Sequence, residues 1–184
     1  MFSLEFSRIH EKAIATSFGS DIWTYLQQGV DNSIVDATTS EGKIGSTNFK
    51  NRYRNVLILL TDGYIEAGIY GKGFDISGKR IADFREKFLQ SGETDINTFF
   101  KKDTKFKVNA LSNPLLNNLE ILVLELYDRT ETNSGASVHP TDLEIMKLIL
   151  EDWLERSHVK RYELHSKFSN KAEAEKIIFK FLGV

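Results

Sequence analysis

The residue best placed to do chemistry is Asp62, which follows a continuous apolar run in the segment VLILLTDGYIEAG at 56–68. A run such as Val56–Leu60 is typical of a strand that is buried on both faces of a parallel sheet. Ligands bind outside the carboxyl ends of such strands, and Mg²⁺ prefers oxygen ligands. We therefore expect Asp62 to hold Mg²⁺, directly or through water. The alternative is a simple turn, because Asp can bond its own backbone and Gly63 supplies a positive φ.

A second carboxylate, Asp128, follows the apolar segment LEILVLELY at 119–127, which predicts a second buried strand. The carboxyl ends of parallel strands meet at one edge of a sheet, so Asp62 and Asp128 are expected at the same edge. Asp128 could then act as a catalytic carboxylate or support a metal ligand. The alternative is an ion pair on the surface with its neighbour Arg129.

Other catalytic or ligand patterns find no support in the sequence. The histidines, His10, His139, His158 and His165, do not have the spacing of zinc ligands. No serine lies in a G-x-S-x-G elbow, and the glycines match no phosphate-binding loop. The chain has no cysteine, which excludes disulfides, thiol catalysis and thiolate metal sites.

The length of 184 residues indicates a single domain, over residues 1–184, with one sizeable core. The formal net charge of −2 gives no electrostatic reason to expect nucleic acid or an anionic membrane as partner. No segment approaches the roughly 18 apolar residues of a membrane helix. The first ten residues lack the pattern of a secretory signal, so we expect a cytoplasmic protein.

Helices and strands are predicted to alternate along the chain. A helix over 141–156 is indicated by the capping box of Thr141 and Glu144 and by the apolar stripe that follows it. Further helices are predicted at 20–30, 78–90, 94–101 and 169–182, and strands at 2–9, 56–60, 119–127 and 159–165. Segment 31–55 is predicted to be a loop with one helical turn near 47–54. The alternation predicts a three-layer α/β sandwich with a mainly parallel central sheet, Rossmann-like in class.

The apolar strand that ends in T-D-G, after a helix whose preceding loop carries a threonine, resembles the von Willebrand factor A domain. In that family three loops at the carboxyl ends of the strands build a metal-ion-dependent adhesion site, with D-x-S-x-S, a Thr and an Asp. The resemblance implies that Asp62 is the third-loop ligand and that Thr16 or Ser17, in ATSFGSDIW at 15–23, is the second-loop ligand. A hydroxyl at the start of a helix is also a common cap. The resemblance further implies binding of a protein partner, whose carboxylate completes the coordination of the ion.

The D-x-S-x-S loop has no counterpart in this chain. The nearest string, FDISGK at 74–79, lacks the second serine and is better explained as a helix cap. In the family's strand order, 3-2-1-4-5-6, residues 56–61 correspond to the fourth strand. We therefore expect either the C-terminal part of a longer protein or a reduced relative of the family. We also expect weak Mg²⁺ binding or none by this chain alone, because one carboxylate and one hydroxyl are too few ligands.

Three functions are consistent with these residues. The first is a protein-interaction module of von Willebrand factor A type with a degenerate or incomplete metal-ion-dependent adhesion site. The second is a Mg²⁺-dependent phosphoester hydrolase, in which Asp62 and Asp128 hold an ion that polarises a phosphoryl oxygen. The third is a structural fragment whose chemistry lies in a preceding segment.

The missing first strand has a consequence for the strand at 56–61. The strand at 119–127 is expected to pair with one of its sides, which leaves a bare edge on the other. A second copy is expected to cover that edge and form a homodimer, unless residues 2–9 fold back onto it. Because the run is apolar on both faces, Ile58→Ala is expected to cost about 2–5 kcal/mol.

Overall fold

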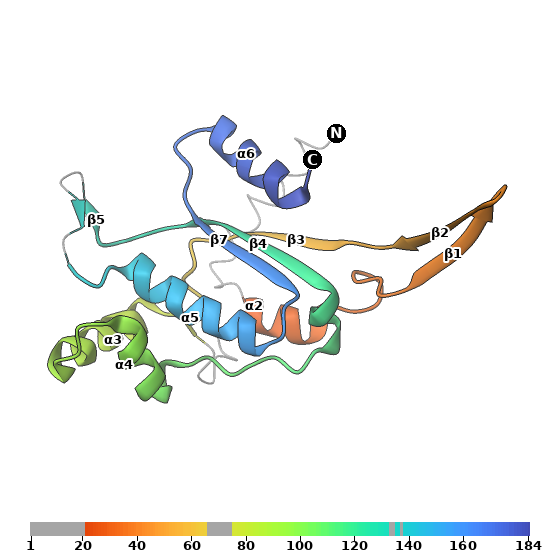
Figure 1. Cartoon of the computed structure of the whole chain (residues 1–184). Helices are drawn as coiled ribbons and strands as arrows, with labels where there is room; N and C mark the ends of the chain where they lie inside the picture. The colour runs from red at the N-terminus through yellow and green to blue at the C-terminus, as the bar shows by residue number, and fades with distance from the viewer. Residues whose placement is uncertain (1–20, 66–74, 133–134, 137) are drawn as a thin grey trace, which may run out of the picture.

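The fold is built around a parallel sheet of three strands (Figure 1). The computed structural model describes residues 21–65, 75–132, 135–136 and 138–184. The strands are β3 (Asn55–Leu60), β4 (Leu119–Leu126) and β7 (Arg161–Ser166), in the order β3-β4-β7. Both neighbouring pairs are parallel, so all three strands end at one edge of the sheet. The strands predicted at 56–60, 119–127 and 159–165 are thereby confirmed, as is the pairing of the first two.

Helices cover both faces of this sheet, as Figure 1 shows. One face carries α3 (Gly78–Ser91), α4 (Ile96–Lys102), α5 (Asp142–Arg156) and α2 (Ile22–Thr24), which continues as the π-helix η1 (Tyr25–Gly29). The other face carries α6 (Lys171–Leu182). Short 3₁₀ turns, η2 (Thr104–Phe106) and η3 (Pro114–Asn118), lie between α4 and β4. The arrangement is therefore α/β with a parallel sheet, which agrees with the predicted fold class at that level.

The helix boundaries follow from capping side chains. At the start of α5, Thr141 Oγ1 accepts a hydrogen bond from the Glu144 amide, and Glu144 Oε2 accepts one from the Thr141 amide. This is the predicted capping box. Asn170 caps α6 through the Glu173 amide, and Ser77 caps α3. These polar groups satisfy amides that have no partner within the helix, which fixes where each helix begins.

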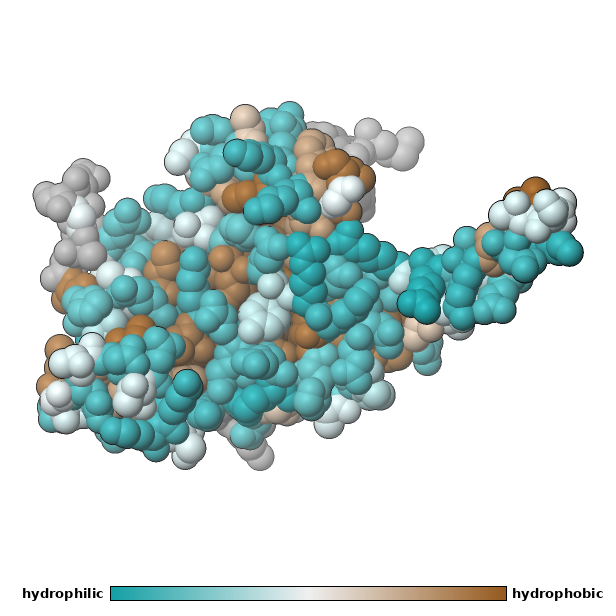
Figure 2. Space-filling view, in the orientation of Figure 1, coloured by the Kyte–Doolittle hydropathy of each residue, from teal (hydrophilic) through white to brown (hydrophobic). Residues whose placement is uncertain are grey.

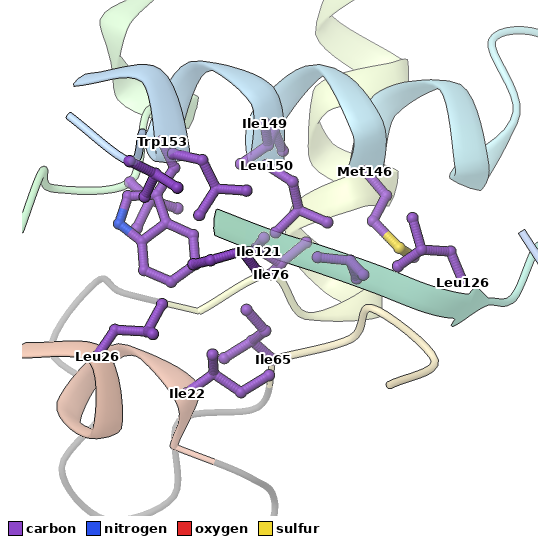
Figure 3. Close-up of a cluster of buried hydrophobic side chains, with 14 of the residues drawn as sticks. Ile22, Leu26, Ile65, Ile76, Ile121, Leu126, Met146, Ile149, Leu150 and Trp153 are labelled. Atoms are coloured by element: carbon purple, nitrogen blue, oxygen red, sulfur yellow. The ribbon is translucent and has the colours of Figure 1, made fainter. Parts of the chain in front are cut away.

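The main core lies between the sheet and the helices of the α5 face (Figure 3). Met146, Ile149 and Trp153 point from α5 toward β4, where Ile121 meets them. All four of these side chains are at most 1% exposed. The alternate residues of β4, Leu122 and Leu124 among them, pack with Phe181 of α6 on the other face. The predicted burial of this strand on both faces is confirmed.

The same prediction for β3 is wrong. Ile58 is 39% exposed and Leu60 is 62% exposed, and both lie on the face that α6 covers only in part. Val56, at the amino end of the strand, does pack in the cluster around Phe181. The cause is position: among the described residues β3 pairs only with β4, so it stands at the edge of the sheet rather than at its centre.

A projecting antiparallel ribbon replaces the predicted loop and helical turn within residues 31–55. β1 (Thr39–Ile44) and β2 (Thr47–Arg52) pair in register and extend away from the rest of the molecule (Figure 1). Gly45 opens the two-residue turn between them with a φ of +60°, the conformation that tight hairpin turns require. We call β1 and β2 with their turn the arm. The helical turn expected near 47–54 is therefore a strand.

A second, small hairpin follows β4, with β5 (Glu131–Thr132) paired to β6 (Gly135–Ala136). The strand predicted at 2–9 lies outside the described residues. Among the described helices, none combines the length and the apolar character that crossing a bilayer requires.

Candidate functional site

Asp62 lies in a turn at the carboxyl end of β3. Its Oδ1 accepts a hydrogen bond from the Tyr64 amide at 3.1 Å, and Thr61 Oγ1 accepts one from the Gly63 amide at 3.1 Å. The Asp62 carbonyl accepts a hydrogen bond from the Tyr127 amide, which joins the ends of β3 and β4. These bonds form the turn that the sequence offered as the alternative role of Asp62.

Gly63 allows this turn to pack tightly against the neighbouring elements. Its φ is +88°, which residues with a side chain rarely adopt. A Cβ at this position would lie 1.9 Å from Met146 Sδ of α5 and 2.7 Å from Leu126 Cδ2 of β4. The Met146 and Leu126 side chains would have to move to admit a Cβ, and the positive φ adds backbone strain, so glycine is strongly favoured at this position.

The carboxylate of Asp62 pairs with Arg129. Arg129 Nη2 lies 3.2 Å from Asp62 Oδ2, and both side chains are 48% exposed. The Arg129 guanidinium also stacks on Tyr64, with Cζ 3.6 Å from the ring centroid. An exposed ion pair stabilises the fold only slightly. Its chemical effect is larger, because a cation bound by Asp62 would have to displace the charge of Arg129.

A buried group next to Asp62 ties this turn to the start of α5. The Tyr64 hydroxyl donates a hydrogen bond to Asp142 Oδ2, and Arg85 of α3 pairs with Asp142 Oδ1. Arg85 also donates to the Pro140 carbonyl at 2.7 Å. Burial, together with the Asp142 carboxylate, raises the pKa of the Tyr64 phenol above its ordinary value. The phenol therefore stays protonated and donates to Asp142 at the start of α5, and Arg85 of α3 binds the other oxygen of the same carboxylate.

Asp128 also supports the start of α5. It is 8% exposed. It accepts hydrogen bonds from the Thr130 amide at 2.8 Å, from the Thr130 hydroxyl and from the Leu143 amide at 3.4 Å. Burial raises the pKa of the Asp128 carboxyl, but the bonds from Thr130 and neighbouring groups outweigh burial and hold this pKa below its ordinary value. The alternative prediction, an ion pair between Asp128 and Arg129 on the surface, is wrong, because Arg129 pairs with Asp62 instead.

The structure places Asp62 and Asp128 at the carboxyl ends of β3 and β4, as the sequence predicts. Within the described part of the chain, no group of three or more His, Cys, Asp and Glu side chains is placed to hold a metal ion. The other two expected ligands, Thr16 and Ser17, lie outside the described residues. The magnesium site therefore stays a prediction. Of its three expected ligands only Asp62 is described, and its carboxylate is paired with Arg129.

A polar crevice of about 370 Å³ opens beside Asp128 at the ends of β4 and β7. Its lining includes Glu131, Ser166, Lys167 and Ser169. Glu125 has a positive φ of 72°, and the pairing of β4 with β7 shifts between Val123 and Leu126. Such bulges turn the end of a strand and often lie next to binding sites. Sequence reasoning missed this crevice, because a bulge leaves no distinct composition in an apolar strand.

A charged cluster lies at the opposite end of β4. Glu120 is 5% exposed. Arg54 Nη2 lies 2.7 Å and Lys160 Nζ 3.0 Å from its carboxylate. Arg54 also donates to the Phe181 carbonyl, and the Arg161 guanidinium lies 4.3 Å from the Phe181 ring centroid. The hydrogen bond from Arg54 holds the pKa of the Glu120 carboxyl below its ordinary value. This cluster fixes the end of α6 to the sheet.

The arm has two faces of different chemistry. Residues paired across an antiparallel ribbon share a face, so the register places Gly42, Ile44, Thr47 and Phe49 on one face. The Phe49 ring lies across Gly42, where an added Cβ would meet it at 2.3 Å. Ile44, at the tip, is 74% exposed.

The opposite face of the arm carries its charges. The register places Glu41, Lys43, Lys50 and Arg52 there, with Glu41 directly across from Lys50. Lys50 Nζ lies 2.7 Å from Glu41 Oε1. The three cations exceed the single anion, so the face is basic. The arm thus offers an uncharged face with exposed apolar atoms and a basic face behind it.

Comparison with known proteins leaves the family open. No protein-family model matches this chain, and neither a curated protein nor a solved structure gives a significant match.

Proposed function

We propose that this chain is a protein-interaction module of von Willebrand factor A type, with a degenerate metal-ion-dependent adhesion site and with the arm as its main binding surface. The observation that carries the proposal is the projecting arm itself (Figures 1 and 2). A two-stranded ribbon is marginally stable in water when it stands alone. An arm whose Ile44 is 74% exposed is therefore best explained by a partner surface that buries it.

The two faces of the arm define the partner's chemistry. The uncharged face, with Ile44 and Phe49, suits an apolar recess on a protein. The basic face, with Lys43 and Arg52 beyond the Lys50–Glu41 pair, suits acidic side chains around that recess. The partner is therefore a protein whose apolar patch has an acidic rim.

The consecutive order β3-β4-β7 supports the family assignment. The resemblance matches these segments to the fourth, fifth and sixth strands of the family, which are neighbours in that order. The pairing of Asp62 with Arg129 supports the degenerate character of the site. In such a site the arginine supplies the positive charge that a bound ion supplies elsewhere in the family.

The proposal is tested with variants of the arm. Ile44→Ser with Phe49→Ser removes the apolar atoms of the uncharged face and leaves the basic face intact. Leu89→Ser is the matched control, because Leu89 is 63% exposed on α3, away from the arm. When the tagged chains are purified, the wild-type chain and the Leu89 variant are expected to carry a bound protein that is absent from the arm variant. The measured Kd for that protein is expected to rise at least about tenfold. Equal binding by all three proteins would refute the arm as the binding surface.

The alternative function is a Mg²⁺-dependent phosphoester hydrolase. The crevice beside Asp128 is the observation that favours it, since Lys167 and two serines line the space next to a buried carboxylate. Hydrolysis of p-nitrophenyl phosphate in the presence of Mg²⁺, with loss of that activity in Asp128→Asn, would establish this alternative. If the chain is an interaction module, hydrolysis is expected to be no faster with the protein than in buffer alone.

A further inference from the structure

Among the described residues, one side of β3 has no paired strand and forms an edge suited to strand pairing. Within the described residues, only β4 pairs with β3. Proline and charged residues usually protect an edge strand from association. The segment 55–61 contains neither. Ile58 and Leu60 add exposed apolar side chains along it.

The sequence around this edge is symmetric about Ile58. Residues 54–62 read RNVLILLTD, with an arginine four positions before Ile58 and an aspartate four positions after it. If the strand is placed against a second copy running in the opposite direction, Arg54 falls opposite the partner's Asp62. Val56 falls opposite the partner's Leu60. The edge is thus complementary to itself in charge and in apolar character.

We propose that two copies of this chain associate through antiparallel pairing of β3 with β3, with the twofold axis at Ile58. The product is a continuous sheet of six strands, and each interface is the same patch on both copies. This proposal extends the proposed function by naming a second copy as one partner. It also brings Arg54 of the partner copy to the end of β3, beside the Asp62–Arg129 pair.

The cover of α6 explains why a second copy suits this edge. Val56, at the amino end of β3, packs with Phe181 of α6, whereas Leu60 at the carboxyl end is 62% exposed. Antiparallel pairing places each exposed Leu60 next to the covered Val56 of the other copy. The half of the strand that α6 leaves open is then covered by the partner's better-packed half.

The side chains at the two ends of the paired segment are partly exposed. The Arg54 side chain is 37% exposed and, within its own copy, bonds Glu120 and the carbonyls of Phe181 and Leu182. The Asp62 side chain is 48% exposed and pairs with Arg129. The contact between copies adds opposite charges at both ends of the paired strands. A parallel or shifted arrangement would not bring these charges together, so the register is specified.

The register is tested with single cysteines, which is direct because the chain has none of its own. In Ile58→Cys the two introduced residues face each other across the axis, with Cα atoms about 4.5–5.5 Å apart, within the range of a disulfide. In Leu60→Cys the two residues are four positions apart along the strands, or about 14 Å. Leu60 is more exposed than Ile58, so reactivity alone would favour the control.

We expect Ile58→Cys to form a disulfide-linked dimer under mild oxidation at least about tenfold faster than Leu60→Cys. Mixing Val56→Cys with Leu60→Cys is expected to give the mixed dimer. Light scattering is expected to show a concentration-dependent dimer for the wild-type chain and a monomer for Ile58→Lys. Circular dichroism of Ile58→Lys is expected to show that the variant stays folded.

Three results would overturn the proposal. The first is a wild-type chain that stays monomeric at micromolar concentration. The second is a dimer in which Leu60→Cys links as fast as Ile58→Cys, which would place the contact in another register or on another surface. The third is a chain that dimerises only after removal of residues 1–20, which would show that this segment covers the edge. Each of these uses the purified chain alone, so the proposed binding through the arm stands or falls separately.

Discussion

The different positions of β3 and β4 predict different costs for the same substitution. Ile58 lies in the edge strand and is 39% exposed, whereas Ile121 lies in the central strand and is 0% exposed. Replacing isoleucine by alanine removes about three methylene equivalents, each worth about 0.8 kcal/mol when fully buried. The transfer term is therefore about 2.4 kcal/mol at a fully buried position.

At Ile121 a cavity adds to this term, because α5 and the sheet enclose the side chain. We expect Ile121→Ala to lower the free energy of unfolding by about 4 kcal/mol. At Ile58 the exposed fraction reduces the transfer term to about 1.5 kcal/mol, and no closed cavity forms. This value replaces the larger cost that burial on both faces would give.

The two variants are compared by urea unfolding, with the protein kept dilute so that association does not contribute. The slope of the free energy with urea should stay constant, since only the midpoint is expected to change. Costs that agree within about 0.5 kcal/mol would mean that β3 is as enclosed as β4. That result would refute the edge position of β3. A cost at Ile58 that grows with protein concentration would instead report the dimer.

Three further outcomes are expected. Gly63→Ala should lower the free energy of unfolding by about 2–5 kcal/mol, from the positive φ and the overlap with Met146; thermal and urea unfolding would measure it, and a change under about 1 kcal/mol would contradict the packing. The lowered pKa of Glu120 should stabilise the fold fully above the ordinary glutamate pKa of about 4.3 and lose this contribution as the pH falls through the lower folded value. Glu120→Gln should therefore flatten the acid limb of stability against pH, and an unchanged limb would exclude this cluster as its cause. Titration calorimetry should detect no micromolar Mg²⁺ affinity, and such an affinity that Asp62→Ala abolishes would restore the metal site.

The sequence predicted the elements whose signals are local. The helix α5 was predicted from the capping box of Thr141 and Glu144 and from its apolar stripe, and β4 from a continuous apolar run. The arm was missed although Gly45-Ser46 is a residue pair typical of a two-residue hairpin turn. Its strands are short, polar and exposed, so the apolar content that guided the other predictions was absent.

The sequence could not rank the two apolar runs by their place in the sheet. Val56–Leu60 and the run in β4 look alike as composition, yet one is an edge and the other a centre. Position in a sheet is set by which strands pair, and pairing depends on contacts distant in the chain. The candidate site was likewise predicted only in its local part. The turn at Asp62 was among the sequence interpretations, whereas its pairing with Arg129, 67 residues away in the chain, was not.

The claim that the arm is a protein-binding surface is tested most directly by a photo-reactive residue at its tip. Benzoylphenylalanine replaces Ile44 in one variant and Leu89 in a control variant, and both are irradiated in the cells that produce the protein. We expect a covalent adduct with one protein at position 44, and loss of that adduct when Phe49→Ser is added. Position 89 should give no such adduct. No adduct at position 44, or the same adduct from both positions, would mean that the arm is not the binding surface.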